Sequence, residues 1–313
     1  MEMADRPGLA AASILAAMAI LGLVDTLIPL IAERFGLWQF HALRSALVIA
    51  ALLAGAAALG WRLRPHRWRG VAARSVMITA AMTIYFACLA SFSIAQAVAG
   101  LFSAPIWVIL VTAFVLRRPV SAVAWAAAAA GFAGVLMSLG FLGGGAEVTA
   151  AALLPMAAGF FYGVGQIGTR EWCAGEGPMT LLFGFFLTIG VFACAGLGLV
   201  SLLPEAVRLE APAQAGFVLR GWQAPDATFA AVVLAQAAGA LVGVGLIIRG
   251  YQLAEASFVS VFEYTLLLFA SLWAWALFGQ GITAAQGAGI ALILGSAALA
   301  ARYGTARRPV PAA

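Results

Sequence analysis

Long apolar runs alternate with short polar segments along the whole chain. A helix that crosses the hydrocarbon core of a membrane needs about 20 mostly apolar residues, and runs of this length recur throughout the sequence. The pattern predicts ten membrane-spanning helices, over residues 9–31, 38–60, 73–91, 96–116, 121–141, 148–169, 178–202, 227–248, 254–278 and 284–302. Because most connections are short, consecutive helices are expected to be antiparallel. The predicted fold class is therefore all-α and integral to a membrane.

Two connections differ from the rest. Three consecutive glycines, Gly143 to Gly145, follow the fifth apolar run. The segment from Leu203 to Asp226 is longer and mixes proline, glutamate and arginine with apolar residues. We expect this second segment to lie along the membrane interface.

Composition favours the same class and indicates a location. Hydrophobic residues make up 64% of the 313 residues and charged residues only 9%, whereas charged residues are about a quarter of a soluble protein. All basic residues are arginine, and lysine and asparagine are absent, which is most simply the coding bias of a GC-rich genome. A bacterial inner (plasma) membrane, crossed several times, is the expected location. The net charge of +5 forms no basic patch interleaved with aromatic residues, so nucleic acid is not an expected partner.

Arginine placement orients the predicted helices, because basic residues concentrate in cytoplasmic loops. If the N-terminus lies in the cytoplasm, the cytoplasmic arginines are Arg6, Arg62, Arg64, Arg67, Arg69, Arg74, Arg117, Arg118, Arg170, Arg249, Arg302, Arg307 and Arg308. The outer ones are then Arg34, Arg208 and Arg220, and Arg44 falls inside a span. Both termini are therefore predicted to be cytoplasmic, which an even number of spans requires.

The two halves of the chain resemble each other. Residues 92–97 read Phe-Ser-Ile-Ala-Gln-Ala and residues 251–256 read Tyr-Gln-Leu-Ala-Glu-Ala, and glycine-rich spans follow later in both halves. We expect two five-helix repeats, residues 1–143 and 144–313. Because five is an odd number, the repeats must be inverted relative to each other, an architecture that recurs in transporters.

Several short motifs resemble the drug/metabolite transporter (DMT) superfamily, in its ten-helix EamA-type branch. They are Gly22-Leu23-Val24-Asp25, Phe40-His41-Ala42-Leu43-Arg44, Ala95-Gln96-Ala97 with Pro105, and Phe262-Glu263-Tyr264. The resemblance covers nearly the whole chain and implies a secondary carrier of small organic metabolites, often an exporter of amino acids. Where many members carry an acidic residue after the fourth span this chain has Arg117-Arg118, so a role for that acid is not carried over.

Three charged residues fall inside predicted spans, where a charge is costly and marks a candidate functional group. Asp25 and Arg44 lie toward the outer ends of the first and second spans, within possible reach of each other. They are interpreted either as a structural pair or as a site at which Asp25 changes its protonation state or its partner during transport.

Glu263 lies near the middle of the ninth span with no basic residue at its depth in the same helix. It is interpreted as a substrate or proton site, or as a neutral carboxyl group bonded to a neighbouring helix. Glu255, at the start of that span, is expected to be an interfacial or capping group.

Uncharged polar and aromatic residues form a second set of candidates. They are Thr79, Thr83, Trp107, Tyr162, Gln166, Gln236 and Tyr264. Each is expected either to line a central cavity or to bond between helices. The glycine pairs Gly159/Gly163 and Gly239/Gly243 are interpreted mainly as packing seams, and Pro105 is expected to kink the fourth span.

The remaining motifs predict no cofactor. Cys88, Cys173 and Cys194 have no metal or disulfide spacing, and Cys88 and Cys194 lie in apolar runs where burial is expected. Residues 163–168 match the dinucleotide fingerprint letter by letter, but that fingerprint needs a preceding strand and these residues lie in a predicted membrane helix.

The sequence therefore predicts a secondary transporter, not an enzyme, that works by alternating access. Its expected partners are membrane lipids and a small-molecule substrate, such as a neutral or aromatic amino acid or a related amphipathic solute, with export as the expected direction. Proton coupling and the oligomeric state stay open. The alternatives are a passive facilitator or channel, a lipid-moving protein and, with less support, an intramembrane enzyme.

Overall fold

The computed structural model describes residues 6–88, 94–139, 141, 153–204 and 216–303. In these ranges every regular element is helical. The elements are α1 (Pro7–Asp25), α2 (Pro29–Ala32), α3 (Leu37–Leu59), α4 (Trp68–Cys88), α5 (Ile94–Leu101), α6 (Ala104–Leu110), the π-helical turn η1 (Val111–Val115), α7 (Ala122–Ser138), α8 (Leu153–Glu171), α9 (Pro178–Leu202), α11 (Gly216–Leu219), α12 (Ala227–Leu253), α13 (Ala256–Val259), the 3-10 turn η4 (Ser260–Tyr264), α14 (Thr265–Phe278) and α15 (Ala284–Tyr303). The predicted glycine break at 143–145 lies outside the described residues.

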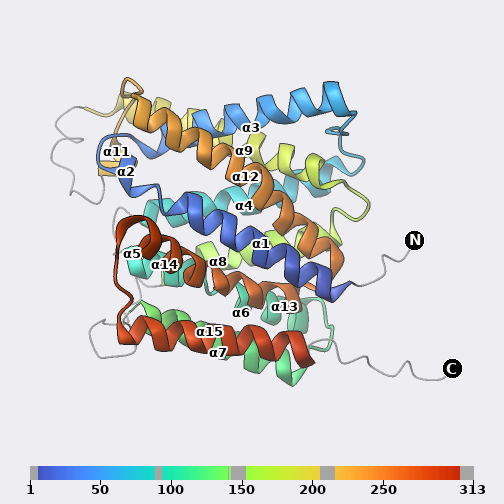
Figure 1. The fold of residues 1–313 in the computed structure, drawn as a ribbon. Coiled ribbons are helices and arrows are strands. Elements are labelled where there is room, and N and C mark those ends of the chain that lie inside the picture. Colours follow the sequence, from blue (N-terminus) through green and yellow to red (C-terminus); the bar gives the residue numbers. More distant parts are fainter. Residues whose placement is uncertain (1–5, 89–93, 140, 142–152, 205–215, 304–313) are drawn as a thin grey trace.

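The long helices cross the molecule side by side (Figure 1). They are stacked from α3 and α9 at one edge, through α1, α12, α4 and α8, to α7 and α15 at the other. The described chain begins and ends on the same side. We call this side, which carries the start of α1 and the end of α15, the terminal face. The opposite side, which carries α2 and the start of α12, is the distal face.

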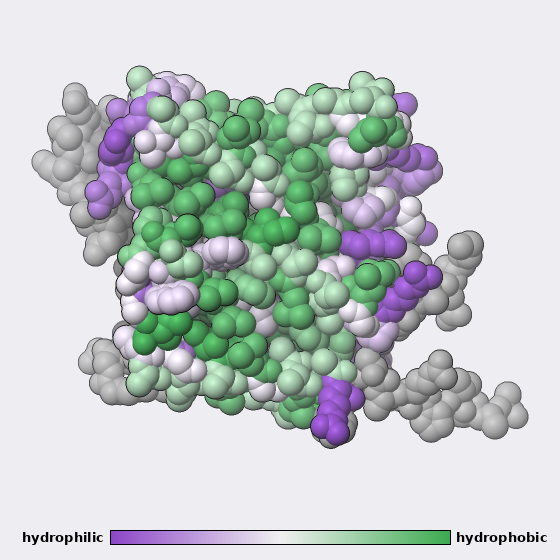
Figure 2. All heavy atoms as spheres, viewed as in Figure 1, coloured by the Kyte–Doolittle hydropathy of each residue, from purple (hydrophilic) through white to green (hydrophobic). Residues whose placement is uncertain are grey.

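The surface has the apolar belt of a membrane protein. Figure 2 shows a broad hydrophobic band between hydrophilic residues at the two faces. Large apolar side chains stand exposed in the band, such as Leu53 at 52% and Val191 at 61%. An exposed apolar area of this extent needs a lipid or protein partner. Cys194 also lies exposed on α9, so its predicted burial is wrong, because α9 turns that side outward; Cys88 is buried, as predicted.

Seven helical spans among the described residues are long and apolar enough to cross a membrane. They are 7–32, 37–59, 98–115, 178–202, 227–253, 256–278 and 284–302. The protein is therefore a multi-pass membrane protein by the length and composition of its helices. Three further helices, α4, α7 and α8, match predicted spans but are shorter or carry charged residues. The count of ten spans stays a prediction.

Most predicted spans coincide with helices, and the differences lie at their ends. The span 178–202 coincides with α9, whereas α4 begins at Trp68 rather than at residue 73. The helix around Arg69 continues past the apolar run because arginine is compatible with a helix at the membrane interface. Hydropathy detects the hydrocarbon core and not the end of the helix.

Three of the spans are interrupted helices. Pro29 and Pro105 each stand in the first turn of a new helix, α2 and α6. Proline is tolerated there because the first turn needs no intrahelical N–H bond, whereas it would break a helix interior. Where a kink was predicted at Pro105, the helix is interrupted over the two residues between α5 and α6. The third interruption is η4, which separates α13 from α14 without a proline.

Glycines bring several helices close together, as predicted. A Cβ on Gly239 or Gly243 of α12 would press against Val24 or Leu21 of α1, at 2.6 and 2.8 Å. In the α7–α15 seam, Gly134 and Gly289 face each other's backbone. Such close approach gives van der Waals contact, which is the main packing force between helices in lipid.

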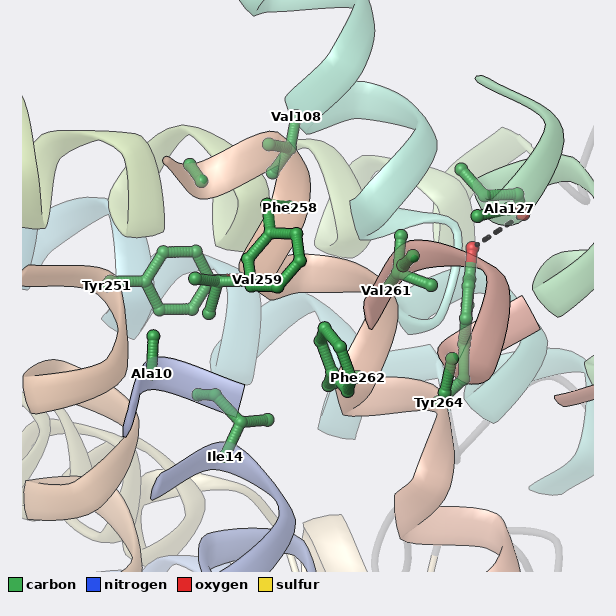
Figure 3. Packing of buried hydrophobic residues seen from close by; sticks show 14 of the residues in the cluster. Ala10, Ile14, Val108, Ala127, Tyr251, Phe258, Val259, Val261, Phe262 and Tyr264 are labelled. Carbon is green, nitrogen blue, oxygen red and sulfur yellow. Dashed lines mark hydrogen bonds between the residues drawn. The ribbon is translucent and has the colours of Figure 1, made fainter. Parts of the chain in front are cut away.

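The largest core cluster lies where α13 and η4 meet α1, α6 and α7. Figure 3 shows Tyr251, Phe258, Phe262 and Tyr264 at its centre. Phe258 and Phe262 pack with ring centroids 5.2 Å apart. This cluster fixes the position of η4, and with it the position of Glu263.

Candidate functional site

Glu263 is a buried carboxyl group in the interrupted helix. It lies in η4 and is 5% exposed. The Tyr162 hydroxyl of α8 donates a hydrogen bond to Glu263 Oε1 at 3.1 Å. The fully buried side chain of Tyr251 also lies close to this carboxyl group. Glu263 thus joins the α13–α14 region to α8 through a polar contact.

The local backbone explains why Glu263 faces α8. Ala254 ends α12 in an extended conformation, and a short helix and a 3-10 turn follow before α14 resumes regular geometry. A 3-10 turn changes the angular spacing of side chains from that of an α-helix. Glu255 occupies the N-cap position of α13, at the start of the helix as predicted, but its side chain makes no capping hydrogen bond.

Asp25, Gln236 and Arg44 form a second polar cluster, at the junction of α1, α12 and α3. Gln236 Nε2 donates to the Val24 carbonyl oxygen at 2.8 Å and to Asp25 Oδ1 at 3.0 Å. Arg44 Nη1 donates to Gln236 Oε1 at 3.4 Å. The ion pairs in the described residues are Arg34–Asp226 and Arg118–Glu171. Asp25 and Arg44 are therefore connected through Gln236 rather than directly.

Arg44 also contacts side chains of α3 and α9. Its Nη2 lies 3.1 Å from His41 Nδ1, and its guanidinium carbon lies 5.1 Å from the centroid of Phe40 and 5.6 Å from that of Phe186. The faces of aromatic rings attract cations. These contacts hold the charge of Arg44 between α3 and α9.

The other predicted residues make local or packing contacts. Trp107 Nε1 donates to Ser103 Oγ at 3.1 Å within the same interrupted helix, and Thr83 Oγ1 donates to the Thr79 carbonyl oxygen at 2.9 Å. Tyr264 Oη donates to the Ala128 carbonyl oxygen of α7 at 3.3 Å (Figure 3). Tyr264 is thus a packing residue between η4 and α7. Gln166 is buried on the same face of α8 as Tyr162.

Sequence reasoning missed the role of Arg74. Arg74 is one of the arginines predicted to be cytoplasmic, but its side chain is only 2% exposed. Its Nε donates to Thr169 Oγ1 at 2.7 Å, and its Nη1 donates to the Leu181 carbonyl oxygen at 3.4 Å. Arg74 therefore connects α4 to α8 and α9. The position of Arg74 inside the third predicted span, 73–91, is the sequence feature that indicates a buried side chain.

Polar contacts connect elements at each face. At the terminal face, Arg118 donates two hydrogen bonds to the Glu171 carboxylate, at 2.5 and 2.9 Å. This carboxylate raises the pKa of the Arg118 guanidinium, which stays charged. At the distal face, Arg34 pairs with Asp226, which also caps α12 by accepting from the Phe229 N–H at 2.7 Å.

Metal binding has no structural support in the described part of the chain. No group of three or more His, Cys, Asp or Glu side chains gathers there in a way that could hold an ion.

Comparison with known proteins shows the fold. No family model matches the sequence, and no curated protein matches it significantly. Among solved structures, 27 chains match. One of these chains comes from a crystal structure. The alignment covers 93% of the present chain and 94% of the solved chain, with a TM-score of 0.73 and 18% sequence identity. At this identity the likeness establishes that the helical arrangement occurs in an experimentally solved protein, and no more.

Proposed function

We propose that this chain is a secondary transporter of the DMT type, with ten membrane-spanning helices in two inverted five-helix repeats. In this proposal the terminal face is cytoplasmic and the membrane is the bacterial inner membrane. The first repeat comprises α1 with α2, α3, α4, α5 to η1, and α7. The second comprises α8, α9, α12, α13 to α14, and α15.

Helix packing supports the inverted repeats. Two helices pack against their proposed equivalents, α3 against α9 and α7 against α15. α1 packs extensively against α12, and their proposed equivalents in the other repeat, α8 and α4, also pack extensively against each other. The interrupted helices α5–α6–η1 and α13–η4–α14 also occupy equivalent positions. Interrupted helices at a repeat interface mark binding sites in many transporters.

Polar contacts at the two faces support the same relation. Gln39 is the third residue of α3 and exchanges two hydrogen bonds with the backbone of Gln223, shortly before α12. Thr180 is the third residue of α9 and donates to the Arg62 carbonyl oxygen, shortly before α4, at 2.7 Å. Each repeat thus attaches the start of its second helix to the segment before the third helix of the other repeat.

The observation that carries the transport proposal is an asymmetry between two equivalent helix pairs. α12 packs against α8, but α1 makes no comparable contact with α4. At the terminal face, Gln252 Nε2 donates to the Glu176 carbonyl oxygen at 2.8 Å, and Arg118 pairs with Glu171. Polar contacts thus join the helices at the terminal face, as Gln39–Gln223 and Arg34–Asp226 do at the distal face. A difference in packing between two equivalent helix pairs is expected of a carrier that alternates between two states.

The proposed solute is a neutral or aromatic amino acid or a related amphipathic metabolite, and the proposed direction is export. Glu263 is the proposed coupling group. It lies in the interrupted helix of the second repeat, and Tyr162 of α8, the first helix of the same repeat, donates a hydrogen bond to it. A carboxyl group buried in a membrane helix and bonded across helices is suited to exchange a proton or a cation during transport.

Counterflow in proteoliposomes tests this proposal. The purified chain is loaded with unlabelled amino acids, nucleosides or small organic cations, and uptake of the labelled compound is measured with and without a proton gradient. Saturable exchange of one solute class is the expected result. Linear, non-saturating flux would instead indicate a facilitator or channel, and no flux of any class through folded protein would contradict the transport proposal.

A further inference from the structure

Asp25 is the membrane-embedded carboxylate that the structure leaves accessible. The residue is exposed, and it lies at the junction of α1, α12 and α3, where Gln236 donates to its carboxyl group and to the Val24 carbonyl oxygen. By contrast, Glu263 is only 5% exposed.

The nearest cation does not neutralise Asp25 by direct contact. The guanidinium of Arg44 is engaged by Gln236 Oε1, by His41 and by two aromatic rings. Gln236 is 1% exposed and holds Asp25 Oδ1 with its amide nitrogen. Its side chain thus separates the two charges and fixes both.

The backbone adds negative potential at the same place. Asp25 is the last residue of α1, and the chain turns at Thr26 before Pro29 starts α2. The C-terminal end of a helix carries a partial negative charge that favours cations. Broken membrane helices place such ends at cation sites in transporters.

An aromatic side chain of another helix lies near Asp25. It is Tyr85 of α4, which is close enough to interact electrostatically with the Asp25 carboxyl group. α1 and α4 make no extensive contact with each other. A carboxylate with an aromatic ring nearby is a favourable environment for an organic ammonium group.

We propose that Asp25 binds the cationic amine of the transported solute, and that Gln236 is a positioning residue that keeps Arg44 from occupying the carboxylate. This inference rests on the proposed transport function. It narrows the solute class to molecules that carry a positively charged amino group beside an apolar or aromatic part.

Binding of three matched probes tests the charge requirement. Phenethylamine, its neutral alcohol analogue and phenylpropionate are titrated into the purified full-length protein, and affinity is measured by calorimetry. We expect the amine to bind at least about tenfold more tightly than the alcohol, which corresponds to one charge-assisted hydrogen bond. Phenylpropionate is expected to bind more weakly than both. Equal affinity for the amine and the alcohol in the unchanged protein would overturn the inference.

Two variants identify the residue that provides the charge. Asp25→Asn is expected to remove the preference for the amine. Glu33→Gln, which removes an exposed carboxylate close by on the distal face, is expected to keep it. An amine preference that persists in Asp25→Asn would contradict the assignment.

A third pair of variants tests the role of Gln236. Gln236→Met is expected to lower amine affinity, because Arg44 is then free to approach Asp25. Adding Arg44→Gln is expected to restore it, which a merely structural defect at position 236 would not allow. If counterflow persists but is indifferent to solute charge, the amine site is wrong while the transport proposal stands. If no solute exchanges at all, the transport proposal itself fails.

Discussion

At the scale of single residues, the sequence identified most of the polar groups but not their partners. Asp25, Arg44, Gln236, Tyr162 and Glu263 were each recognisable as polar positions within apolar runs. The hydrogen bond from Tyr162 to Glu263 joins residues 101 positions apart, and the bridge from Gln236 to Asp25 joins residues 211 apart. Such contacts depend on which helix faces pack together, and helical spacing within one segment carries no information about that.

The role proposed for Glu263 leads to a prediction about coupling. Glu263→Gln keeps the shape of the side chain and an oxygen that accepts from Tyr162 Oη, so we expect the protein to fold. Without a titratable group, transport is expected to lose its dependence on the proton gradient and to slow about a hundredfold or more, the lower end of what a positioned acid–base group contributes. The measurement is counterflow across a pH series. Tyr162→Phe is the matched control, because it removes the hydrogen bond and leaves the carboxyl group. An unchanged pH profile in Glu263→Gln would show that the coupling group lies elsewhere.

At the scale of elements, apolar runs predicted where helices lie, and Pro105 was expected to kink one of them. Pro29, for which no interruption was predicted, and Pro105 both stand at interruptions, because their missing N–H cannot join a continuous helix. The 3-10 turn η4 contains no proline or glycine. Its geometry is set by the packing of Phe258, Phe262 and Tyr264 against neighbouring helices, which is tertiary information. This is why the sequence placed Glu263 in a regular span rather than in an interruption.

The seam between α7 and α15 gives a prediction about stability. A Cβ on Gly289 would lie 2.6 Å from the Gly134 carbonyl oxygen and 2.7 Å from the Ser138 nitrogen, so the two helices would have to separate. We expect Gly289→Ala to destabilise the protein by about 1–3 kcal/mol, the usual cost of overpacking. The measurement is the thermal unfolding midpoint in detergent.

The same helix supplies the control for that experiment. Gly287 and Gly295 of α15 have open space where a Cβ would stand. Gly287→Ala and Gly295→Ala change helix propensity in the same way without crowding α7, and we expect both to keep or slightly raise the midpoint. A fall of equal size in all three variants would mean that the seam is not the cause.

At the scale of the whole molecule, the proposed repeat was the most informative feature of the sequence. Part of its first copy, residues 92 and 93, lies outside the described residues. The packing of α3 on α9 and of α7 on α15 relates the two halves more directly than the sequence match does. What the sequence could not indicate is that α12 packs against α8 whereas α1 makes no comparable contact with α4. In a carrier of the proposed kind one sequence supports two states, so the state observed depends on small differences in contact energy.

The Arg118–Glu171 pair joins two elements at the terminal face. The pair is 51% and 24% exposed, and exposed pairs contribute up to about 1 kcal/mol. If it holds the terminal face closed, Arg118→Ala is expected to increase the open population there up to about fivefold. A cysteine at Ser257 reports this opening, because Ser257 is 5% exposed and lines the cavity beside Arg118, Glu171 and Glu255.

Labelling of Ser257→Cys with a membrane-impermeant maleimide at pH 8 measures the effect. The exposed Cys194 is first replaced by alanine. Cys173 can stay, because burial raises the pKa of its thiol to about 11, and only about one thiol in a thousand is then the reactive thiolate at that pH. Arg118→Ala is expected to speed labelling, and the exchange of charges in Arg118→Glu with Glu171→Arg is expected to slow it again. Arg34→Ala breaks the pair at the opposite face and is expected to leave labelling unchanged or slower. If Arg34→Ala accelerated labelling as much as Arg118→Ala, the change would be general loosening rather than movement between two states.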